Sequence, residues 1–396
     1  MAYIRRLESG LWQATVRLPN GKRVSRTSPR KGDVKAWATK LEADIQSGTW
    51  RDPRLGRMTF GEWDERWWAA RVVEEETRRG DRAQREHRIL PQWQDWPLGK
   101  ITRLDVQAWI RRMEKDGVPA PTIRRTYNLF ALMVRDAVIE GLIGETPCVR
   151  ITLPPVEPQL PRWCTRDQVD RIKAELPTGH AVMTELMVTS GPRWGEAAAV
   201  VGRERPDGRG NPVDWARRKL RIVGSLTQYG KWKEYPKSSA SRREIPLTAE
   251  VCEGMAALLQ GRSPDSWVFV GRRRSPVTGD YPTLSGANWR KVWAAAIERA
   301  NERIAEENRR RPPGEQIDPI PAYHPHDCRH TAASWLVQAG VPLYHVQHLL
   351  GHESFATTQR YAHLAPDAHD AITDAWERMA THERRTGRER KGRNGR

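Results

Sequence analysis

The hydrophobic pattern of the first 48 residues predicts a small sheet backed by a helix. Short strand-like stretches are separated by the turn signals Ser9-Gly10 and Pro19-Asn20-Gly21. Apolar side chains then recur at helical spacing. The predicted elements are strands at Ile4–Leu7, Leu11–Leu18 and Arg23–Thr27 and a helix at Val34–Ile45.

From residue 58 to residue 150 the apolar positions follow helical spacing alone, which predicts an all-helical bundle. Thr59 and Thr102 are plausible N-caps of two helices, and a third helix begins near Thr122. Most of the tryptophans here are expected in the core, because aromatic side chains at helical spacing usually pack together. A run of arginines either tracks a phosphate backbone or forms an exposed helix face. Its members are Arg78, Arg79, Arg82, Arg85 and Arg88.

Composition divides the chain into three domains and a tail. Residues 48–57 are rich in Gly, Pro and Arg, and residues 153–161 contain four prolines, so both stretches read as linkers. Between residues 160 and 382 helical patterns surround a β-rich region at Leu220–Leu247. The Arg- and Gly-rich residues 383–396 are expected to be disordered. The predicted domains are therefore 1–48, 58–150 and 160–382.

The charge of the chain points to a polyanionic partner. Lys and Arg number 67 against 49 Asp and Glu, a net charge of +18, and such an excess attracts phosphates. An Arg-rich composition without a binding role is the simpler alternative. Residues 1–48 carry ten basic and four acidic residues, or +6. A small basic sheet fits a DNA groove, although a merely solvated sheet face has the same composition.

Cysteine and hydropathy patterns predict a soluble intracellular protein. Four scattered cysteines without a CxxC pair suit a reducing cytosol. We find neither a signal peptide nor an apolar run of about 20 residues.

Eight of the eleven histidines fall between His324 and His369. A metal site is the obvious alternative. The spacing is not HExxH, however, the cysteines do not join the cluster, and acidic ligands are sparse. We therefore expect no metal.

Two further motifs precede the histidines. Ser190–Glu196 reads SGPRWGE and places Arg193 at a helix boundary between apolar runs. Pro236–Leu247 reads PKSSASRREIPL and places Lys237 near a hairpin. Either motif alone is weak, because a hairpin lysine is usually just solvated.

Together these motifs resemble the tyrosine recombinase, or phage integrase, family. The boxes SGPRWGE, PKSSASRREIPL, HDCRHT, LGH and TTQRYAHL occur in the family's order, most strongly between Arg162 and Leu364. The resemblance implies the catalytic residues Arg193, Lys237, His326, Arg329, His352 and Tyr361. The chain departs from the family at Pro192, Trp194 and Cys328, which are neighbours of these positions, and residues 299–319 look like an insertion.

The resemblance implies a multidomain fold: an N-terminal β-sheet and helix that bind arm-type DNA, an all-α core-binding bundle, and a mixed α+β, mainly helical catalytic domain of the DNA breaking-rejoining type. Its chemistry needs neither ATP nor metal nor cofactor. Arg193, Arg329 and His352 would bind the scissile phosphate. Tyr361 would attack it and leave a 3′-phosphotyrosine.

The two remaining catalytic residues would transfer protons. His326 would accept the tyrosine proton and Lys237 would protonate the departing 5′ oxygen. The other histidines of the cluster are interpreted as structural or surface residues. They are His330, His345, His348, His363 and His369.

The same resemblance implies double-stranded DNA with attachment sites as partner and a homotetramer in the synaptic complex. It also implies a host DNA-bending protein, an excision factor and a location on the nucleoid in the bacterial cytoplasm, with no membrane. Residues 367–381 are expected to dock on a neighbouring protomer. The alternatives are a catalytically inactive DNA-binding regulator, a type IB topoisomerase and a metal-dependent nuclease.

Overall fold

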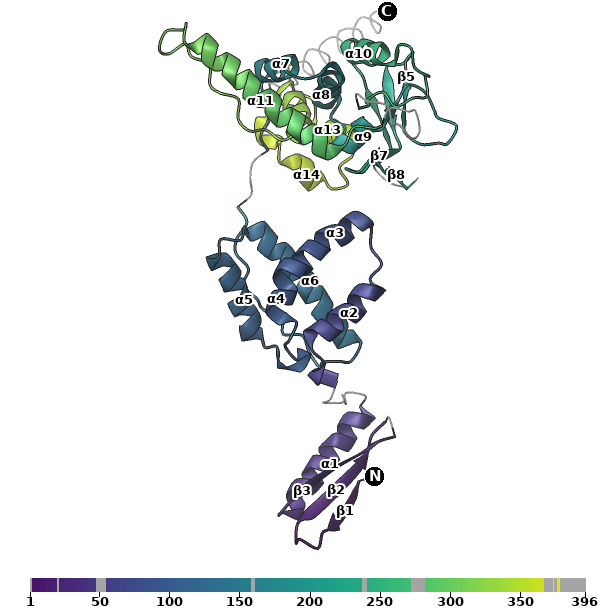
Figure 1. The fold of residues 1–396 in the computed structure, drawn as a ribbon, viewed down its shortest axis with the longest axis vertical. Helices are drawn as coiled ribbons and strands as arrows, with labels where there is room; N and C mark the ends of the chain where they lie inside the picture. Colours follow the sequence, from purple (N-terminus) through teal and green to yellow (C-terminus); the bar gives the residue numbers. More distant parts are fainter. Residues whose placement is uncertain are drawn as a thin grey trace, which may run out of the picture. The chain divides into compact units, whose positions relative to one another are not determined.

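The computed structural model describes residues 2–19, 21–47, 55–157, 161–236, 241–271 and 282–366, with residues 373, 376 and 377. Contacts between residues divide the chain into two compact units, 1–158 and 159–396 (Figure 1). Lys237 and the predicted tail 383–396 lie outside the described residues, as does most of the segment 367–381.

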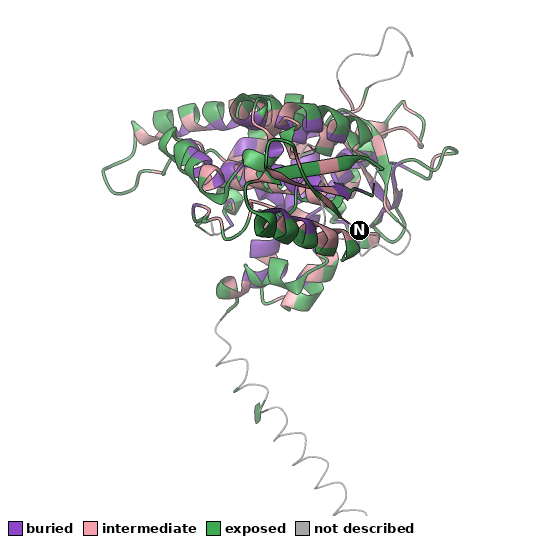
Figure 2. Cartoon of the chain, turned by 90° about the horizontal axis from the view of Figure 1, so that it is seen from below, coloured by how far each residue is buried: buried purple, intermediate pink, exposed green. Residues whose placement is uncertain are grey.

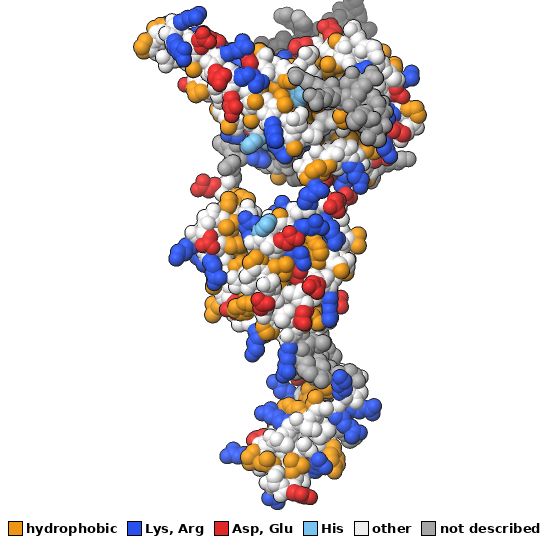
Figure 3. Space-filling view, viewed as in Figure 1, with side chains coloured by type: hydrophobic (Ala, Val, Ile, Leu, Met, Phe, Trp, Pro, Cys, Tyr) orange, Lys and Arg blue, Asp and Glu red, His pale blue; other side chains and the backbone are white. Residues whose placement is uncertain are grey.

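The first unit begins with the antiparallel sheet β1-β2-β3 and helix α1. These elements span Tyr3–Arg6, Trp12–Arg17, Arg23–Ser28 and Lys31–Gln46. Ala14 and Val16 alternate on one face of β2 and are buried against Val34 and Ala38 of α1, because successive strand residues point to opposite faces. The opposite face is polar, and its arginines Arg5, Arg17 and Arg23 are exposed. Figure 3 shows basic side chains outnumbering acidic ones on the visible side of this region.

The rest of this unit is helical, as expected. Its elements are α2 (Phe60–Ala70), α3 (Glu75–Gln84), the π-helical turn η2 (Arg85–Ile89), α4 (Leu90–Trp93), α5 (Arg103–Lys115) and α6 (Ala120–Ile139), with the 3-10 turns η1 (Leu55–Arg57) and η3 (Leu98–Lys100). Thr59 and Thr102 cap α2 and α5 in complete capping boxes. Phe130 lies in the core against Phe60, Trp93 and Trp109, at ring distances of 5.2–5.4 Å.

The arginine run of this bundle divides between internal and exposed positions. Arg85 holds the buried Asp64 with both Nε and Nη2, and Arg78 donates to the backbone oxygens of Trp68 and Arg71. Arg79 and Arg82 are exposed. At least two of these arginines therefore stabilise the bundle.

The second unit surrounds two small sheets with helices. The helices are α7 (Arg166–Ala174), α8 (Thr178–Ser190), α9 (Trp194–Ala198), α10 (Ala249–Leu259), α11 (Gly286–Asn308), α12 (Asp327–Gln338), α13 (Leu343–Leu350) and α14 (Phe355–Gln359), followed by the 3-10 turn η4 (Ala362–Leu364). The strands are β4 (Val200–Val201), β5 (Asn211–Asp214), β6 (Lys219–Ile222), β7 (Gly224–Leu226), β8 (Trp232–Glu234) and β9 (Arg243–Pro246). Buried residues of this unit include Phe269, Trp289 and Trp293, and Figure 2 shows buried segments of the chain in purple among exposed ones in green.

The β structure begins earlier in the sequence than the pattern predicted. The larger sheet has the order β4-β5-β6-β9, and β7 pairs with β8. β4 and β5 precede Leu220, and the short, Pro-containing β5 gives little alternation to detect. Asn211 on β5 is fully buried, and its amide donates to the backbone oxygens of Glu196 and Gly224. It thereby holds α9 against β7.

The segment interpreted as an insertion is a helical extension followed by a return segment. The long helix α11 continues to Asn308, and residues 309–326 run back along it. Asn301 and Asn308 lie two helical turns apart and each both donates to and accepts from the returning backbone, at Ile320 and Ile317 respectively. Paired amide bonds of this kind replace the ladder bonds that the returning chain lacks.

Candidate active site

Five of the six predicted catalytic residues belong to the described part of the second unit. Arg193 precedes α9, His326 and Arg329 belong to the start of α12, His352 follows α13, and Tyr361 follows α14. The sixth, Lys237, lies outside the described residues. The site is thus assembled at helix ends, where side chains can point into a shared space.

Arg329 is a buried cation held by backbone oxygens. The residue is 2 % exposed, and its guanidinium donates from Nη1 to the Gly191 oxygen at 2.7 Å and from Nη2 to the Leu350 oxygen at 2.6 Å. These oxygens lie at the C-terminal ends of α8 and α13, where the helix dipole favours a positive charge. Burial and the neighbouring Arg193 lower the pKa of Arg329 to about 9, so the side chain remains cationic at pH 7.

Two glycines permit this arrangement. Gly191 and Gly351 end α8 and α13 in the left-handed conformation, with φ of 67° and 66°. A Cβ on Gly191 would lie 2.5 Å from Leu350 Cδ2. The close approach of the two helix ends, and hence the position of Arg329 between them, depends on glycine at residue 191.

Arg193 is held by a buried carboxylate. Glu196 accepts from the Arg193 backbone at 2.8 Å and from Arg193 Nη1 at 2.9 Å. The same carboxylate accepts from both Nη atoms of Arg243, at 3.2 and 2.9 Å. Burial opposes ionisation of this fully buried acid, yet the adjacent Arg243 and Arg193 lower the pKa of Glu196 to about 2. Glu196 is therefore ionised and already paired with arginine.

Arg243 joins three parts of the site. Besides Glu196, it donates from Nε to the Leu349 oxygen at 2.6 Å, at the end of α13. Arg193 contacts the same turn through Nη2 to the Gly351 oxygen at 3.4 Å. Neither Glu196 nor Arg243 was among the predicted site residues. The available signal was their place inside the SGPRWGE and SRREIPL boxes.

Tyr361 lies just beyond α14, at the N-cap of the turn η4. α14 ends at Gln359, and the Tyr361 backbone donates to the Thr358 oxygen before η4 begins. The side chain is 2 % exposed and packs with Val337, Val346 and Leu350. Burial raises the pKa of the Tyr361 phenol, while Arg329 pulls it down.

The histidine in contact with Tyr361 is His330 and not His326. His330 Nδ1 makes a short hydrogen bond with the Tyr361 hydroxyl. His326 is exposed and meets His330 edge to face, at a ring distance of 5.0 Å. The interpretation of His330 as a structural or surface residue overlooked its spacing from His326. The two histidines are four residues apart, and such residues share one face of a helix.

His352 lies close to the two arginines and is held by a hydroxyl. Its Nδ1 hydrogen-bonds Thr358 Oγ1 at 2.9 Å, and Thr358 is fully buried. Burial and the charge of Arg329 lower the pKa of His352 to about 4, and burial and His326 lower that of His330 to the same value. Both rings are therefore neutral at pH 7. The site combines cationic arginines with neutral donors, a composition that suits a phosphate.

Within the described residues, no group of three or more His, Cys, Asp or Glu side chains could hold a metal ion. Of the described helices, none is long and apolar enough to cross a membrane.

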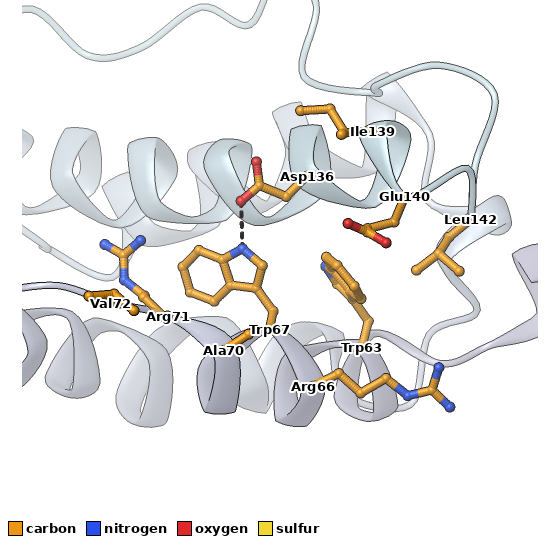
Figure 4. A pocket seen from close by; sticks show the side chains of 10 residues that line it. All are labelled: Trp63, Arg66, Trp67, Ala70, Arg71, Val72, Asp136, Ile139, Glu140 and Leu142. Carbon is orange, nitrogen blue, oxygen red and sulfur yellow. Dashed lines mark hydrogen bonds between the residues drawn. The ribbon is translucent and has the colours of Figure 1, made fainter.

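A hollow of about 570 Å³ lies elsewhere, between α2 and α6 of the helical bundle (Figure 4). Trp63 and Trp67 line it, and Trp67 donates from its indole nitrogen to Asp136 at 2.6 Å. The hollow holds none of the predicted catalytic residues, so its tryptophans serve the packing of the bundle.

The fold is similar to those of solved integrase structures. The Tn1549 transposon integrase in complex with transposon right end DNA has a TM-score of 0.62 and 17 % identity, over 82 % of this chain and 100 % of that one. A lambda integrase tetramer bound to a Holliday junction has a TM-score of 0.55 and 19 % identity, over 91 % and 94 %.

Sequence comparison then establishes the family. Residues 162–368, more than half of the chain, match the phage integrase family. The putative prophage phiRv2 integrase of Mycobacterium tuberculosis is 25 % identical over 374 residues, covering 91 % of each chain. Tyrosine recombinase XerC of Mycobacterium bovis is 25 % identical over 281 residues, covering 68 % of this chain and 80 % of its own. The chain therefore belongs to the phage integrase family and is a tyrosine site-specific recombinase.

Proposed function

We propose that this recombinase cleaves double-stranded DNA at attachment sites through a covalent bond between Tyr361 and a 3′ phosphate, and so integrates and excises a phage or integrative element. One observation carries the proposal. The Tyr361 hydroxyl, a buried Arg329 and Arg193 belong to one site whose carboxylate, Glu196, is already paired with arginine. Such a site attracts an anion and presents a hydroxyl to it.

The chemistry follows from the charges. A phosphodiester anion repels a nucleophile until its charge is neutralised, and the forked guanidinium groups of Arg193 and Arg329 match its non-bridging oxygens. They stabilise the transition state most, because the charge on those oxygens is greatest there. His352 adds a donor. Lys237 protonates the departing 5′ oxygen. Rejoining reverses these steps without ATP, because the phosphotyrosine conserves the bond.

We assign the three predicted domains their family roles. The basic face with Arg5, Arg17 and Arg23 binds arm-type DNA as a strand pair in a groove, and the helical bundle binds the core site. Four protomers assemble on two sites, as the lambda integrase tetramer does on a Holliday junction. The DNA lies on the nucleoid in the cytoplasm of a bacterial host, with a DNA-bending protein and an excision factor as further partners.

The test is a covalent-trapping assay. The protein is mixed in EDTA with an end-labelled duplex that carries a candidate core sequence and a nick beside the scissile phosphate. The short cleaved fragment diffuses away and leaves any adduct trapped. We expect a protein-linked band that is lost in Tyr361→Phe and kept in Tyr344→Phe, a control tyrosine that is 60 % exposed on α13.

Three outcomes contradict the proposal. Tight and specific binding without an adduct favours the inactive regulator. Cleavage that needs a restored divalent metal and survives Tyr361→Phe favours a metal-dependent nuclease. Relaxation of supercoiled DNA without a defined site would indicate a type IB topoisomerase.

A further inference from the structure

The nucleophile has an immediate partner that the family motif did not indicate. His330 Nδ1 is hydrogen-bonded to the Tyr361 hydroxyl, and the two rings lie 6.0 Å apart and tilted by 44°. We propose that His330 is a catalytic residue that accepts the Tyr361 proton during DNA cleavage and returns it during rejoining. This inference rests on the proposed function and deepens it.

Geometry favours His330 over His326. A general base must lie within hydrogen-bonding reach of the proton that it removes. Among the described residues, His330 meets that condition, whereas no hydrogen bond joins His326 to Tyr361 and its ring contact is with His330. His326 is exposed and stands at the N-cap of α12, while His330 lies within the helix. His326 thus packs edge to face against His330 and does not itself hydrogen-bond the Tyr361 hydroxyl.

The helix also fixes His330 with respect to the phosphate site. His330 directly follows Arg329, whose guanidinium donates to backbone oxygens at the ends of two helices. The titratable or charged groups that act on the ring are His326, Asp327 and Arg329 of α12 and Arg360 and Tyr361 beyond α14. Because the pKa of His330 is lowered to about 4, by burial first, the ring is neutral at pH 7 and has a nitrogen lone pair.

The step balances without a further reactant. Tyr361 Oη forms a bond to phosphorus while the bond from phosphorus to the 5′ oxygen breaks. The phenol proton moves to His330 Nδ1, and the 5′ oxygen takes a proton from the acid of the proposed mechanism, Lys237. The negative phosphate between Arg193 and Arg329 stabilises the imidazolium that forms. In rejoining, the 5′ hydroxyl attacks and the proton returns from His330 to Tyr361.

The experiment measures single-turnover cleavage from pH 5 to pH 10 on the nicked duplex. His330→Gln is compared with His326→Gln and with His363→Gln, a control histidine that is exposed beyond Tyr361. A second duplex carries sulfur at the bridging 5′ position. Thiolate leaves without protonation, so this substrate isolates the base from the acid.

We expect His330→Gln to slow cleavage at pH 7 by about 10²–10⁴-fold on both substrates, the usual contribution of a general base. Its rate should rise tenfold per pH unit towards pH 10, because hydroxide then removes the proton. Replacing Tyr361 by the more acidic 3,5-difluorotyrosine should restore much of the loss. A residue that merely supports the fold would lower the rate without changing its pH dependence.

Several results would overturn the inference while leaving the proposed function intact. In each case the wild type forms the adduct. The first result is a His330→Gln rate within threefold of the wild-type rate, and the second is an unchanged pH profile in that variant. The third is the hydroxide-dependent profile appearing in His326→Gln instead. If the variant does not fold, difluorotyrosine in the otherwise unchanged protein serves instead. If the pH dependence of cleavage is the same with tyrosine and with difluorotyrosine at residue 361, proton transfer to His330 is contradicted. Absence of an adduct in the wild type would refute the proposed function itself.

Discussion

Replacement of Arg243 by methionine should strongly destabilise the second unit, residues 159–396. Methionine keeps the length of the side chain but removes one of the two arginines that pair with the fully buried Glu196. The carboxylate then keeps a hydrogen bond from the Tyr235 hydroxyl and its ion pair with Arg193, whose side chain is 38 % exposed. Breaking a buried ion pair by removing one partner costs about 3–5 kcal/mol, because it leaves an uncompensated charge. The pKa of Glu196 supports that range. Its fall from 4.5 to about 2 corresponds to about 3 kcal/mol at the usual conversion.

The pH dependence has a definite sign. The folded protein lowers the pKa of Glu196, so the stabilisation is complete above pH 4.5 and is lost as the pH falls towards 2. The difference in the free energy of unfolding between wild type and Arg243→Met should therefore narrow over that window. The double variant Glu196→Gln, Arg243→Met should lose less than the sum of its single changes, because it leaves no buried charge unpaired.

The assay is urea unfolding of the full chain at pH 7 and at lower pH, followed by hydrogen exchange of peptides from α9 and β9. Arg242→Met is a matched control, since Arg242 pairs with Glu234, which is 61 % exposed. That surface pair should contribute less than about 1 kcal/mol. Equal losses for the two variants, or a difference that does not narrow in acid, would refute the reasoning.

Two further changes test the frame around the site. Gly191→Ala should destabilise the protein by more than Gly340→Ala. Both residues have positive φ, but an added Cβ would contact Leu350 only at residue 191. Thermal unfolding measures the difference, and equal decreases in Tm would contradict this prediction. Asn308→Ala removes the two hydrogen bonds between the Asn308 side chain and the Ile317 backbone. It should speed tryptic cleavage within residues 309–311 severalfold, whereas Asn288→Ala, at the other end of α11, should leave that cleavage unchanged.

Some of the site could be read from the sequence and some could not. The order of the boxes was enough to nominate Arg193, Arg329, His352 and Tyr361, because those positions are defined by neighbours in sequence. The buried Asn211 and the partnership of Glu196 with Arg243 were not visible, because each depends on segments brought together by folding. The same holds for Arg85, whose role in the bundle was settled by the buried Asp64.

The sequence by itself determined the family, the helical and β-rich regions, the capping threonines and the residue types that the chemistry needs. These follow from local preferences and from short motifs, in which the physical cause lies within a few residues. Only the tertiary structure decided which histidine contacts Tyr361. His326 and His330 share one face of α12, and the choice between them depends on where the chain places Tyr361, more than thirty residues later. Tyr361 lies there because its ring packs into a core formed by α12 and α13, and no local pattern encodes that contact.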